Sequence, residues 1–318
     1  MEPQQSNTVL CVVGPTACGK TRMGALLARQ LGGEVVSVDS MQIYRGLPIG
    51  TAAPRPEEML GVPHHMVAVA DVRESWSVAR FVREADRWVQ DILRRGKLPV
   101  LVGGTGLYLD ALVAGRDFAA GQAEGPWRAR LQERLRSEGI GPLLEELRQV
   151  DPESAARLHP ADEKRILRAL EVYRETGRTI SQHNAETRSL PLKYRAVYLG
   201  LCFRDREDMK ALIDRRVDAM VAEGLLQEAD WLLGQDLPPT ATALQAIGYK
   251  ELAAYRRGEA TLEEAVDQVK LRSRQYAKRQ LTWLRRNREI RWICWDKDRD
   301  FDKALQEATE ILSAQGLG

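Results

Sequence analysis

The chain has 318 residues and a formal net charge of +2, with 29% charged and 44% hydrophobic residues. This composition is typical of a soluble globular protein, and no apolar run approaches the roughly 18 residues that a membrane span requires. The first eight residues lack the basic and apolar regions of a signal peptide. We therefore expect a cytoplasmic protein that has no membrane partner.

The four cysteines form no CxxC pair, and together with the four histidines they give no zinc-binding pattern. We expect Cys11, Cys18, Cys202 and Cys294 to be reduced and unpaired, as is usual in the cytosol. Cys18 stands just before a predicted helix, and a helix N-terminus tends to lower a thiol pKa. We therefore expect Cys18 to react with a small alkylating agent.

The first third of the chain alternates between strand and helix patterns. A short apolar run ends at a glycine, and helical spacing follows it. The expected elements are a strand at Thr8–Val13, a helix at Lys20–Leu31, a strand at Glu34–Val38, a helix at Ser77–Arg95, a strand at Pro99–Val102 and a helix from Leu107. This alternation predicts a parallel α/β sheet flanked by helices.

The pattern changes between residues 124 and 179, which have helical periodicity and no strand-like run. Helices are expected at Trp127–Arg136, Pro142–Val150 and Asp162–Glu175. Strand patterns resume at Ala196–Leu201 and Ile290–Trp295. We predict an α/β core in two parts, residues 1–114 and 191–318, interrupted by an all-helical insertion at residues 115–190.

A basic stretch lies near the C-terminus. Between Gln268 and Arg291 there are nine Lys or Arg residues and one acid, Glu289. Such a density of positive charge predicts a surface that contacts phosphates. It is equally typical of a solvated helix face, and charge alone does not separate the two.

Residues 14–21 read Gly-Pro-Thr-Ala-Cys-Gly-Lys-Thr and match the phosphate-binding P-loop pattern, between a strand and a helix. The glycines let backbone N–H groups wrap around a polyphosphate, and the helix N-terminus adds positive charge. Lys20 supplies a full charge, and the Thr21 hydroxyl can hold Mg²⁺. The predicted phosphate-binding residues are Gly14, Pro15, Thr16, Ala17, Cys18, Gly19, Lys20 and Thr21. The fold expected is thus a P-loop NTPase-like α/β fold.

The loop identifies a phosphate ligand but no reaction. Most P-loops serve NTP hydrolysis or kinase chemistry, which also uses an Asp at a strand end to hold Mg²⁺. Asp39, which ends the second predicted strand, fits that description. A small-molecule kinase therefore stays open at this point.

Further motifs point to one family. They are Asp-Ser-Met-Gln-Ile-Tyr-Arg-Gly at residues 39–46, Ile-Gly-Thr-Ala at 49–52, Val-Pro-His-His at 62–65, Gly-Gly-Thr-Gly-Leu-Tyr at 103–108 and Arg-Ala-Leu-Glu at 168–171. With the P-loop, this series resembles the bacterial tRNA dimethylallyltransferase family from about Thr8 to about Trp283. The family often has Lys-Pro where this chain has Ala53-Pro54, so Ala53 is assigned no role. The zinc finger of eukaryotic relatives is also missing from the sequence.

The resemblance implies that an adenine N6 amine in tRNA attacks C1 of dimethylallyl pyrophosphate, with Mg²⁺ as cofactor and a monomer as the acting form. Lys20, the loop and Arg216 would then stabilise the departing pyrophosphate. Asp39 would accept the N6 proton, as an alternative to holding Mg²⁺. Thr105 would lie beside the target nucleotide, although it also fits a helix N-cap. Arg216 equally fits a surface position on an amphipathic helix.

The implied target is adenosine 37 in the anticodon stem-loop, which must flip out of its stack to react. Lys164 and Arg168 share one helix face, and Ile166 and Leu167 would pack on the other side. His64 and His65 are read as structural residues or tRNA contacts. The predicted tRNA-binding residues are Asp39, Ser40, Met41, Gln42, Thr105, Arg128, Lys164, Arg165, Ile166, Leu167, Arg168, Ala246, Ile247, Gly248, Tyr249, Lys250 and Glu251.

Two further alternatives accompany the kinase. An adenylate isopentenyltransferase has a similar loop but uses free AMP or ADP as acceptor. A non-catalytic RNA-binding protein would need neither the P-loop nor Asp39. The long helical insertion and the basic stretch favour a macromolecular acceptor.

Overall fold

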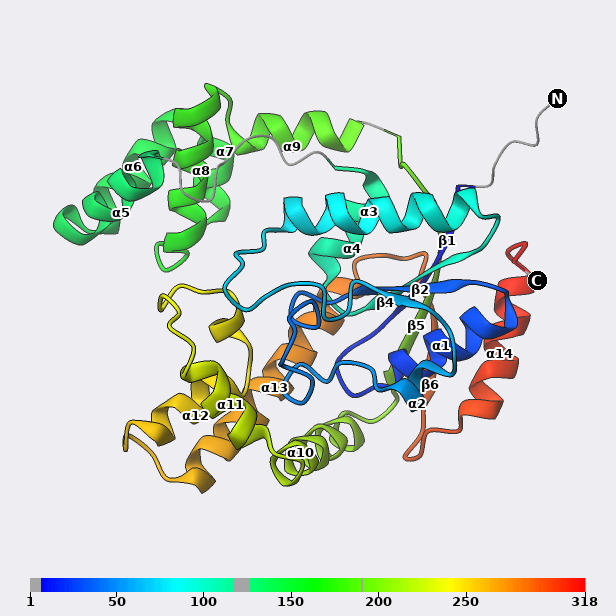
Figure 1. The fold of residues 1–318 in the computed structure, drawn as a ribbon. Coiled ribbons are helices and arrows are strands. Elements are labelled where there is room, and N and C mark those ends of the chain that lie inside the picture. Colours follow the sequence, from blue (N-terminus) through cyan, green and yellow to red (C-terminus); the bar gives the residue numbers. More distant parts are fainter. Residues whose placement is uncertain (1–6, 117–125, 190, 318) are drawn as a thin grey trace. The chain divides into compact units, whose positions relative to one another are not determined.

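The computed structural model describes residues 7–116, 126–189 and 191–317, without the side chains of residues 187–189 (Figure 1). The chain divides into two compact units, Met1–Val113 with Lys193–Gly318, and Ala114–Leu192. The second unit covers the segment expected as a helical insertion, of which residues 117–125 and 190 lie outside the described residues. No helix in the described part of the chain is long and apolar enough to cross a membrane.

The first unit is built on a sheet whose described strands all pair in parallel. The strands are β1 (Thr8–Val13), β2 (Glu34–Val38), β3 (His64–His65), β4 (Pro99–Gly103), β5 (Arg195–Phe203) and β6 (Arg291–Trp295), in the order β3-β2-β4-β1-β5-β6. The predicted parallel α/β sheet is confirmed. The sequence analysis missed β3, because a two-residue strand is too short to produce a periodic pattern.

Helices cover both faces of this sheet (Figure 1). On one face lie α1 (Lys20–Gln30) and α14 (Phe301–Ser313), and on the other lie α3 (Val78–Arg94) and α4 (Gly106–Ala114). Leu10 and Leu199 in the sheet share a buried core with Met23 and Leu27 of α1. Because both faces are buried, the strands appear in the sequence as nearly continuous apolar runs.

The rest of the first unit is mainly helical. It contains α2 (Pro56–Met59), α10 (Arg206–Ala222), α11 (Leu225–Leu233), the 3-10 helix η1 (Ala243–Gln245), α12 (Tyr249–Arg256) and α13 (Leu262–Leu284). Helix α13 packs against α10 and α12 and carries most of the basic stretch. Two of its cations pair with acids of α10: Lys270 with Asp218 at 2.6 Å, and Arg274 with Asp214. Part of the basic stretch therefore joins two helices.

The second unit is all-helical in its described residues. It consists of α5 (Pro126–Glu138), α6 (Ile140–Val150), α7 (Pro152–Arg157), α8 (Glu163–Thr176) and α9 (Ile180–Ser189). Its core includes Leu131, Leu143 and Ile166. The buried carboxylate of Asp151 ties α7 to α9, because it accepts hydrogen bonds from Ser154 N at 3.1 Å and Ser181 N at 3.2 Å.

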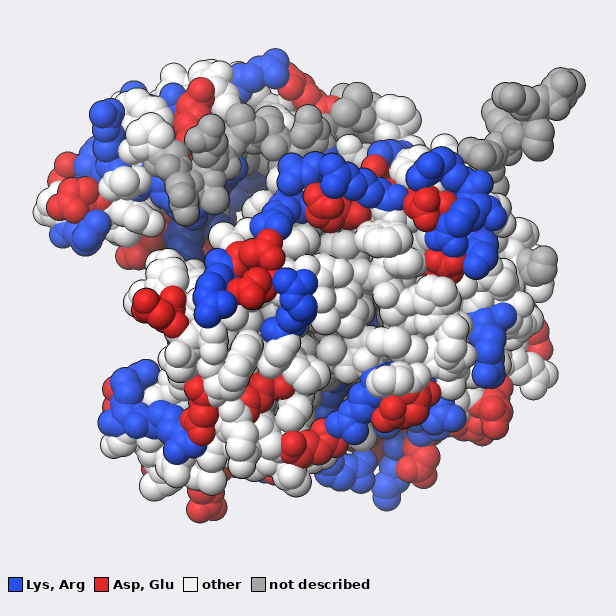
Figure 2. Space-filling model, viewed as in Figure 1, with Lys and Arg blue, Asp and Glu red and all other residues white. Residues whose placement is uncertain are grey.

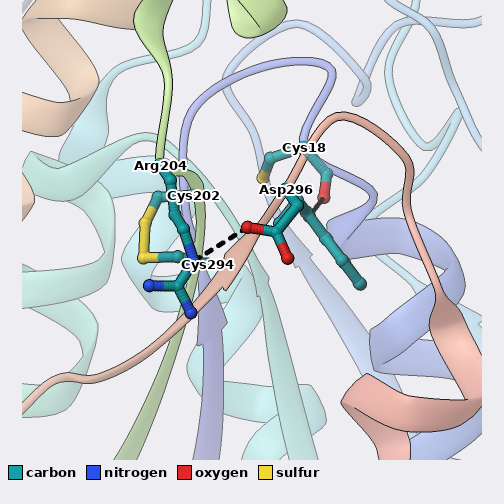
Figure 3. The surroundings of a disulfide bond; sticks show 6 residues. Cys18, Cys202, Arg204, Cys294 and Asp296 are labelled. Carbon is teal, nitrogen blue, oxygen red and sulfur yellow. Dashed lines mark hydrogen bonds and ion pairs between the residues drawn. A yellow bond between two sulfur atoms is a disulfide. The ribbon is translucent and has the colours of Figure 1, made fainter.

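The expectation of four unpaired thiols is wrong for Cys202 and Cys294, which are joined by a disulfide (Figure 3). They lie opposite each other on the neighbouring strands β5 and β6, with Cα atoms 4.7 Å apart. Just beyond the disulfide, Arg204 pairs with Asp296 at 3.0 Å. The pair escaped the sequence analysis because 92 residues separate the two cysteines along the chain.

Charged side chains of both signs lie on the face of the molecule shown in Figure 2. On the face shown in Figure 2, Lys and Arg alternate with Asp and Glu, as expected for a net charge of +2. The charge that matters for function is therefore local, and it must be sought at individual sites.

Candidate active site

The P-loop connects β1 to α1 and has a shape that depends on its two glycines. Gly14 has φ 153°, and a Cβ atom there would lie 2.4 Å from the Leu201 carbonyl oxygen. Gly19 has φ 88°, and a Cβ atom there would lie 2.8 Å from the Phe301 ring. Side chains at these positions would be both strained and in collision, so only glycine fits.

Three side chains hold the loop in place. The Thr16 N–H donates to Gln280 Oε1 at 2.8 Å, and Lys20 Nζ donates to the Pro15 carbonyl oxygen at 2.6 Å. Arg216 of α10 donates from Nη1 to Thr16 Oγ1 at 3.3 Å. The sequence left Arg216 either at the phosphate loop or on the surface of an amphipathic helix. The structure places it at the loop. Loss of hydration on burial lowers the pKa of both Lys20 and Arg216.

Asp39 lies directly after β2, at the carboxyl edge of the sheet where parallel α/β folds bind ligands. Its Oδ1 accepts hydrogen bonds from Met41 N at 2.8 Å and Gln42 N at 3.3 Å. No described residue donates a hydrogen bond to its other oxygen. One half of the carboxylate thus fixes the turn, and the other half is available to a substrate.

The P-loop and Asp39 open into one cavity of about 920 Å³. Of the predicted site residues, those lining it are Thr16, Ala17, Gly19, Lys20, Thr21, Asp39, Ser40, Met41, Gln42, Arg216, Ala246 and Ile247. Ala53 and His64 also line it. The cavity is at the upper end of the size typical of small-molecule sites, and it brings the predicted phosphate loop and the predicted base together.

Thr105 follows β4 and lies beside α13. Its hydroxyl is buried and finds no hydrogen-bond partner of normal geometry within the described residues. Gln280 lies close by, because a Cβ atom on Gly104 would meet Gln280 Nε2 at 2.2 Å. Burial raises the pKa of Tyr276, which lines the cavity one helical turn before Gln280, to about 12. Thr105 does not itself line the cavity, and its side chain interacts with Tyr276, which does.

A second loop, Ile49–Ala52, is held by Glu228 of α11. The buried Glu228 carboxylate accepts hydrogen bonds from Ile49 N at 2.9 Å, Gly50 N at 2.7 Å and the Tyr249 hydroxyl at 2.7 Å. The Ala52 carbonyl in turn accepts a hydrogen bond from Gln42 Nε2 at 3.0 Å. This chain of contacts links α11 and α12 to the turn that holds Asp39.

The predicted tRNA segment at residues 246–251 begins α12 and is only partly accessible. Tyr249 is fully buried, and Glu251 caps the helix by accepting a hydrogen bond from Gly248 N at 2.9 Å. Lys250 is exposed. Tyr249 and Glu251 therefore have structural partners. The residues left for a ligand are the exposed Lys250 and the cavity-lining Ala246 and Ile247.

In the second unit, Arg128, Lys164 and Arg165 are exposed, which fits a predicted contact surface. Arg168 is half-buried and pairs with the buried Glu171 at 2.8 Å. The side chain of Ile166 is fully buried in the core of this unit, and Leu167 packs against that core. A contact from Ile166 to tRNA through its side chain is therefore excluded by its burial.

The surroundings of Cys18 argue against the predicted reactivity. Its side chain is fully buried, and burial raises the pKa of its thiol above the ordinary value, with Lys20 and the helix start opposing the shift only in part. The sequence rule holds for an accessible thiol at a helix N-terminus, whereas here the thiol points into the core.

Neither adjacent histidine belongs to a metal cluster. His65 Nε2 lies 2.8 Å from Glu34 Oε2, and its ring stacks on Trp88. His64 Nδ1 lies 2.9 Å from the Val62 carbonyl oxygen. Among the described residues, no group of three or more His, Cys, Asp or Glu side chains is placed to hold a metal.

Several residues that shape the cavity were not singled out by the sequence analysis. Tyr276 and Gln280 lie within the basic stretch, which was noted for charge alone, while Glu228 and Arg299 belong to no motif. The available signal for the first two was their helical spacing within the stretch, which puts Tyr276 and Gln280 on one face of the helix.

The fold and the site together define a class of protein. A parallel α/β sheet has a P-loop after its central strand β1, and an Asp after β2 opens into the same cavity, which is the arrangement of a P-loop protein. Residues 42–287 match the family described as IPP transferase, and residues 7–74 match the family described as isopentenyl transferase. The chain belongs to the IPP transferase family.

Relatives with closely similar sequences support this assignment over nearly the whole chain. The tRNA dimethylallyltransferase of Symbiobacterium thermophilum is 46% identical and aligns over 96% of this chain and 94% of its own length. The tRNA dimethylallyltransferase of Halalkalibacterium halodurans is 42% identical over 96% of this chain and 97% of its own. The family resemblance read from the motifs is confirmed.

Solved structures agree with the fold. The tRNA isopentenylpyrophosphate transferase of Bacillus halodurans has 42% identity and a TM-score of 0.72, covering 97% of this chain and 96% of its own. A eukaryotic dimethylallyltransferase acting on tRNA has 30% identity and a TM-score of 0.82, covering 97% of this chain and 80% of its own.

Proposed function

We propose that this enzyme transfers a dimethylallyl group from dimethylallyl pyrophosphate to the N6 amine of adenosine 37 in tRNA. The products are N6-(dimethylallyl)adenosine and pyrophosphate. Relatives named tRNA dimethylallyltransferase, and a eukaryotic relative that acts on tRNA, support this reaction. The observation that carries the proposal is the single cavity lined by the P-loop, Arg216 and Asp39.

The P-loop side of the cavity would hold the donor. As the bond between C1 and oxygen breaks, its electron pair stays on the pyrophosphate, whose negative charge grows. Lys20 and Arg216 line that space and are held at the loop by hydrogen bonds to Pro15 and Thr16, so their positive charges would stabilise the growing negative charge together with the loop N–H groups. Mg²⁺ would add positive charge there. The Thr21 hydroxyl, which lines the cavity in the first turn of α1, is the oxygen ligand that would hold it.

The Asp39 side would hold the acceptor. The N6 amine attacks C1 and becomes positively charged, and the free oxygen of Asp39 takes its proton. Asp39 keeps its orientation because its other oxygen is fixed by Met41 N and Gln42 N. Thr105, which interacts with the cavity-lining Tyr276, would lie beside the flipped nucleotide.

The predicted tRNA contacts outside the cavity would bind the phosphate backbone of the anticodon stem-loop. Exposed Arg128, Lys164 and Arg165 suit this role, because phosphate contacts come mainly from accessible cations. We place the reaction in the cytoplasm, as expected for a tRNA substrate. We expect a monomer, because one chain supplies the loop, the base and the cations.

The test is incubation of the protein with labelled dimethylallyl pyrophosphate and bulk tRNA, followed by nucleoside analysis. Label should appear on adenosine 37 in the presence of Mg²⁺ without ATP, and chelation of Mg²⁺ should stop the transfer. A parallel reaction with AMP as acceptor should give no product. Transfer to AMP, or labelling of tRNA that strictly requires ATP, would contradict the proposal.

A further inference from the structure

The segment after β6, residues 295–301, contacts the P-loop at three successive positions, and we call it the C-terminal strap. Trp295 Nε1 donates to the Cys18 carbonyl oxygen at 2.8 Å, and Arg299 Nη1 donates to the Ala17 carbonyl oxygen at 3.3 Å. The Phe301 ring fills the space beside Gly19. The strap is anchored at its start by the Cys202–Cys294 disulfide (Figure 3).

Aromatic packing orients Arg299. Its guanidinium lies 5.8 Å from the centre of the Phe301 ring, and Phe301 also packs against Trp295 at 5.2 Å. Arg22 of α1 lies over the same Phe301 ring at 4.6 Å. Arg299 is thus directed toward the cavity that it helps to line, by contacts that leave its charge uncompensated.

Arg299 has no acidic partner within the described residues, whereas Asp296, near the start of the strap, pairs with Arg204, which follows β5. Arg22, Arg215 and Arg216 line the same cavity, where Glu58 and Asp39 offset part of the positive charge at Arg216. Cations gathered in this way repel one another, and the repulsion is relieved when an anion binds. Pyrophosphate carries several negative charges, and Arg299 would add to the positive charge that Lys20 and Arg216 offer it.

We infer that Arg299 is a pyrophosphate-binding residue and that the C-terminal strap forms one wall of the donor site. This inference rests on the proposed function, in which the P-loop holds the pyrophosphate of the donor. Arg299 closes the loop on the Ala17 side, across from Arg216 at Thr16. Its guanidinium keeps further N–H donors for phosphate oxygens beyond the one used on Ala17. It therefore stabilises bound donor and departing pyrophosphate alike.

The test compares four variants of the full chain. Arg299→Ala removes the side chain, Arg299→Lys keeps a charge, and Arg299→Gln keeps a hydrogen-bond donor for the Ala17 carbonyl without a charge. Lys297→Ala is the matched control, since Lys297 is an exposed strap residue that does not line the cavity. Calorimetry measures the affinity for pyrophosphate with Mg²⁺, and steady-state kinetics measures KM and kcat for the donor at saturating tRNA.

Arg299→Ala and Arg299→Gln should weaken pyrophosphate binding by about tenfold or more and raise the donor KM, as expected when a charge-assisted hydrogen bond is lost. Arg299→Lys should recover part of the loss. Lys297→Ala should bind within twofold of the parent, and tRNA affinity should be unchanged in all four. The affinity of Arg299→Ala should also depend less on ionic strength.

Other results would overturn the inference. If the Arg299→Gln protein binds pyrophosphate as tightly as the Arg299→Lys protein, the charge of Arg299 is not needed. Arg299 then only supports the loop through its hydrogen bond to Ala17. If Arg299→Ala binds pyrophosphate like the parent while Lys20→Ala does not, the loop assignment stands and the role of Arg299 fails. If the parent itself binds no pyrophosphate with Mg²⁺, the proposed function fails first.

Discussion

Replacement of Asp39 by Asn separates a general base from a structural carboxylate. Asn is nearly isosteric with Asp, and its carbonyl oxygen can still accept the hydrogen bonds from Met41 N and Gln42 N that fix the turn. What changes is the second oxygen, which becomes an NH₂ group. This group cannot accept the N6 proton, so the turn should survive while the chemistry fails.

The expected loss follows from that geometry. Removing a positioned base typically lowers a rate by about 10²–10⁴-fold, which corresponds to roughly 2.7–5.4 kcal/mol of barrier. Because both turn hydrogen bonds are retained, the melting temperature should change little. Asp39→Ala, in contrast, leaves two N–H groups without their acceptor, so it should also lose about 1–3 kcal/mol of stability.

The assay is a single-turnover rate measurement across a Mg²⁺ titration, with the affinities for tRNA and for the donor measured separately. Asp71→Asn is a matched control, because Asp71 Oδ1 accepts a similar turn hydrogen bond from Arg73 N at 2.9 Å but does not line the cavity. A stable Asp39→Asn protein that transfers at nearly the parent rate would refute the base role. Recovery of the rate at high Mg²⁺ would assign Asp39 to the metal instead.

Three further predictions concern the surface, the loop and the sheet edge. Lys164→Ala with Arg165→Ala should weaken tRNA binding and reduce the slope of log affinity against log salt, and an unchanged slope would make them ordinary surface charges. Cys18 should resist a small alkylating agent in the native protein and react after unfolding, because its thiol is buried; rapid native labelling would contradict this. Hydrogen bonds from Arg95, Lys97 and His65 hold the pKa of Glu34 well below its usual range. Glu34 should therefore contribute stability above the unfolded-state pKa of about 4.3 and lose it as pH falls further, so urea titrations should find Glu34→Gln less stable at neutral pH but not in strong acid.

Local sequence was sufficient for the features that depend on short segments. The strands Thr8–Val13 and Glu34–Val38 were predicted with the bounds that the structure has, because burial on both faces makes them continuous apolar runs. The P-loop was evident because its glycines, Lys20 and Thr21 must stand at fixed spacing to surround a phosphate. The order of motifs was also sufficient to identify the family, which the relatives confirm.

Only the tertiary structure decided which distant residues complete the site. Gln280 meets Thr16 across 264 positions of the chain, and Arg299 meets Ala17 across 282. The same is true of Cys202 and Cys294, whose pairing depends on β5 and β6 being neighbours in register. Burial likewise reversed the expectation for Cys18, since the local rule for a helix N-terminus cannot tell which way a side chain points. Sequence patterns report on neighbours along the chain, whereas hydration, pKa and charge balance depend on neighbours in space.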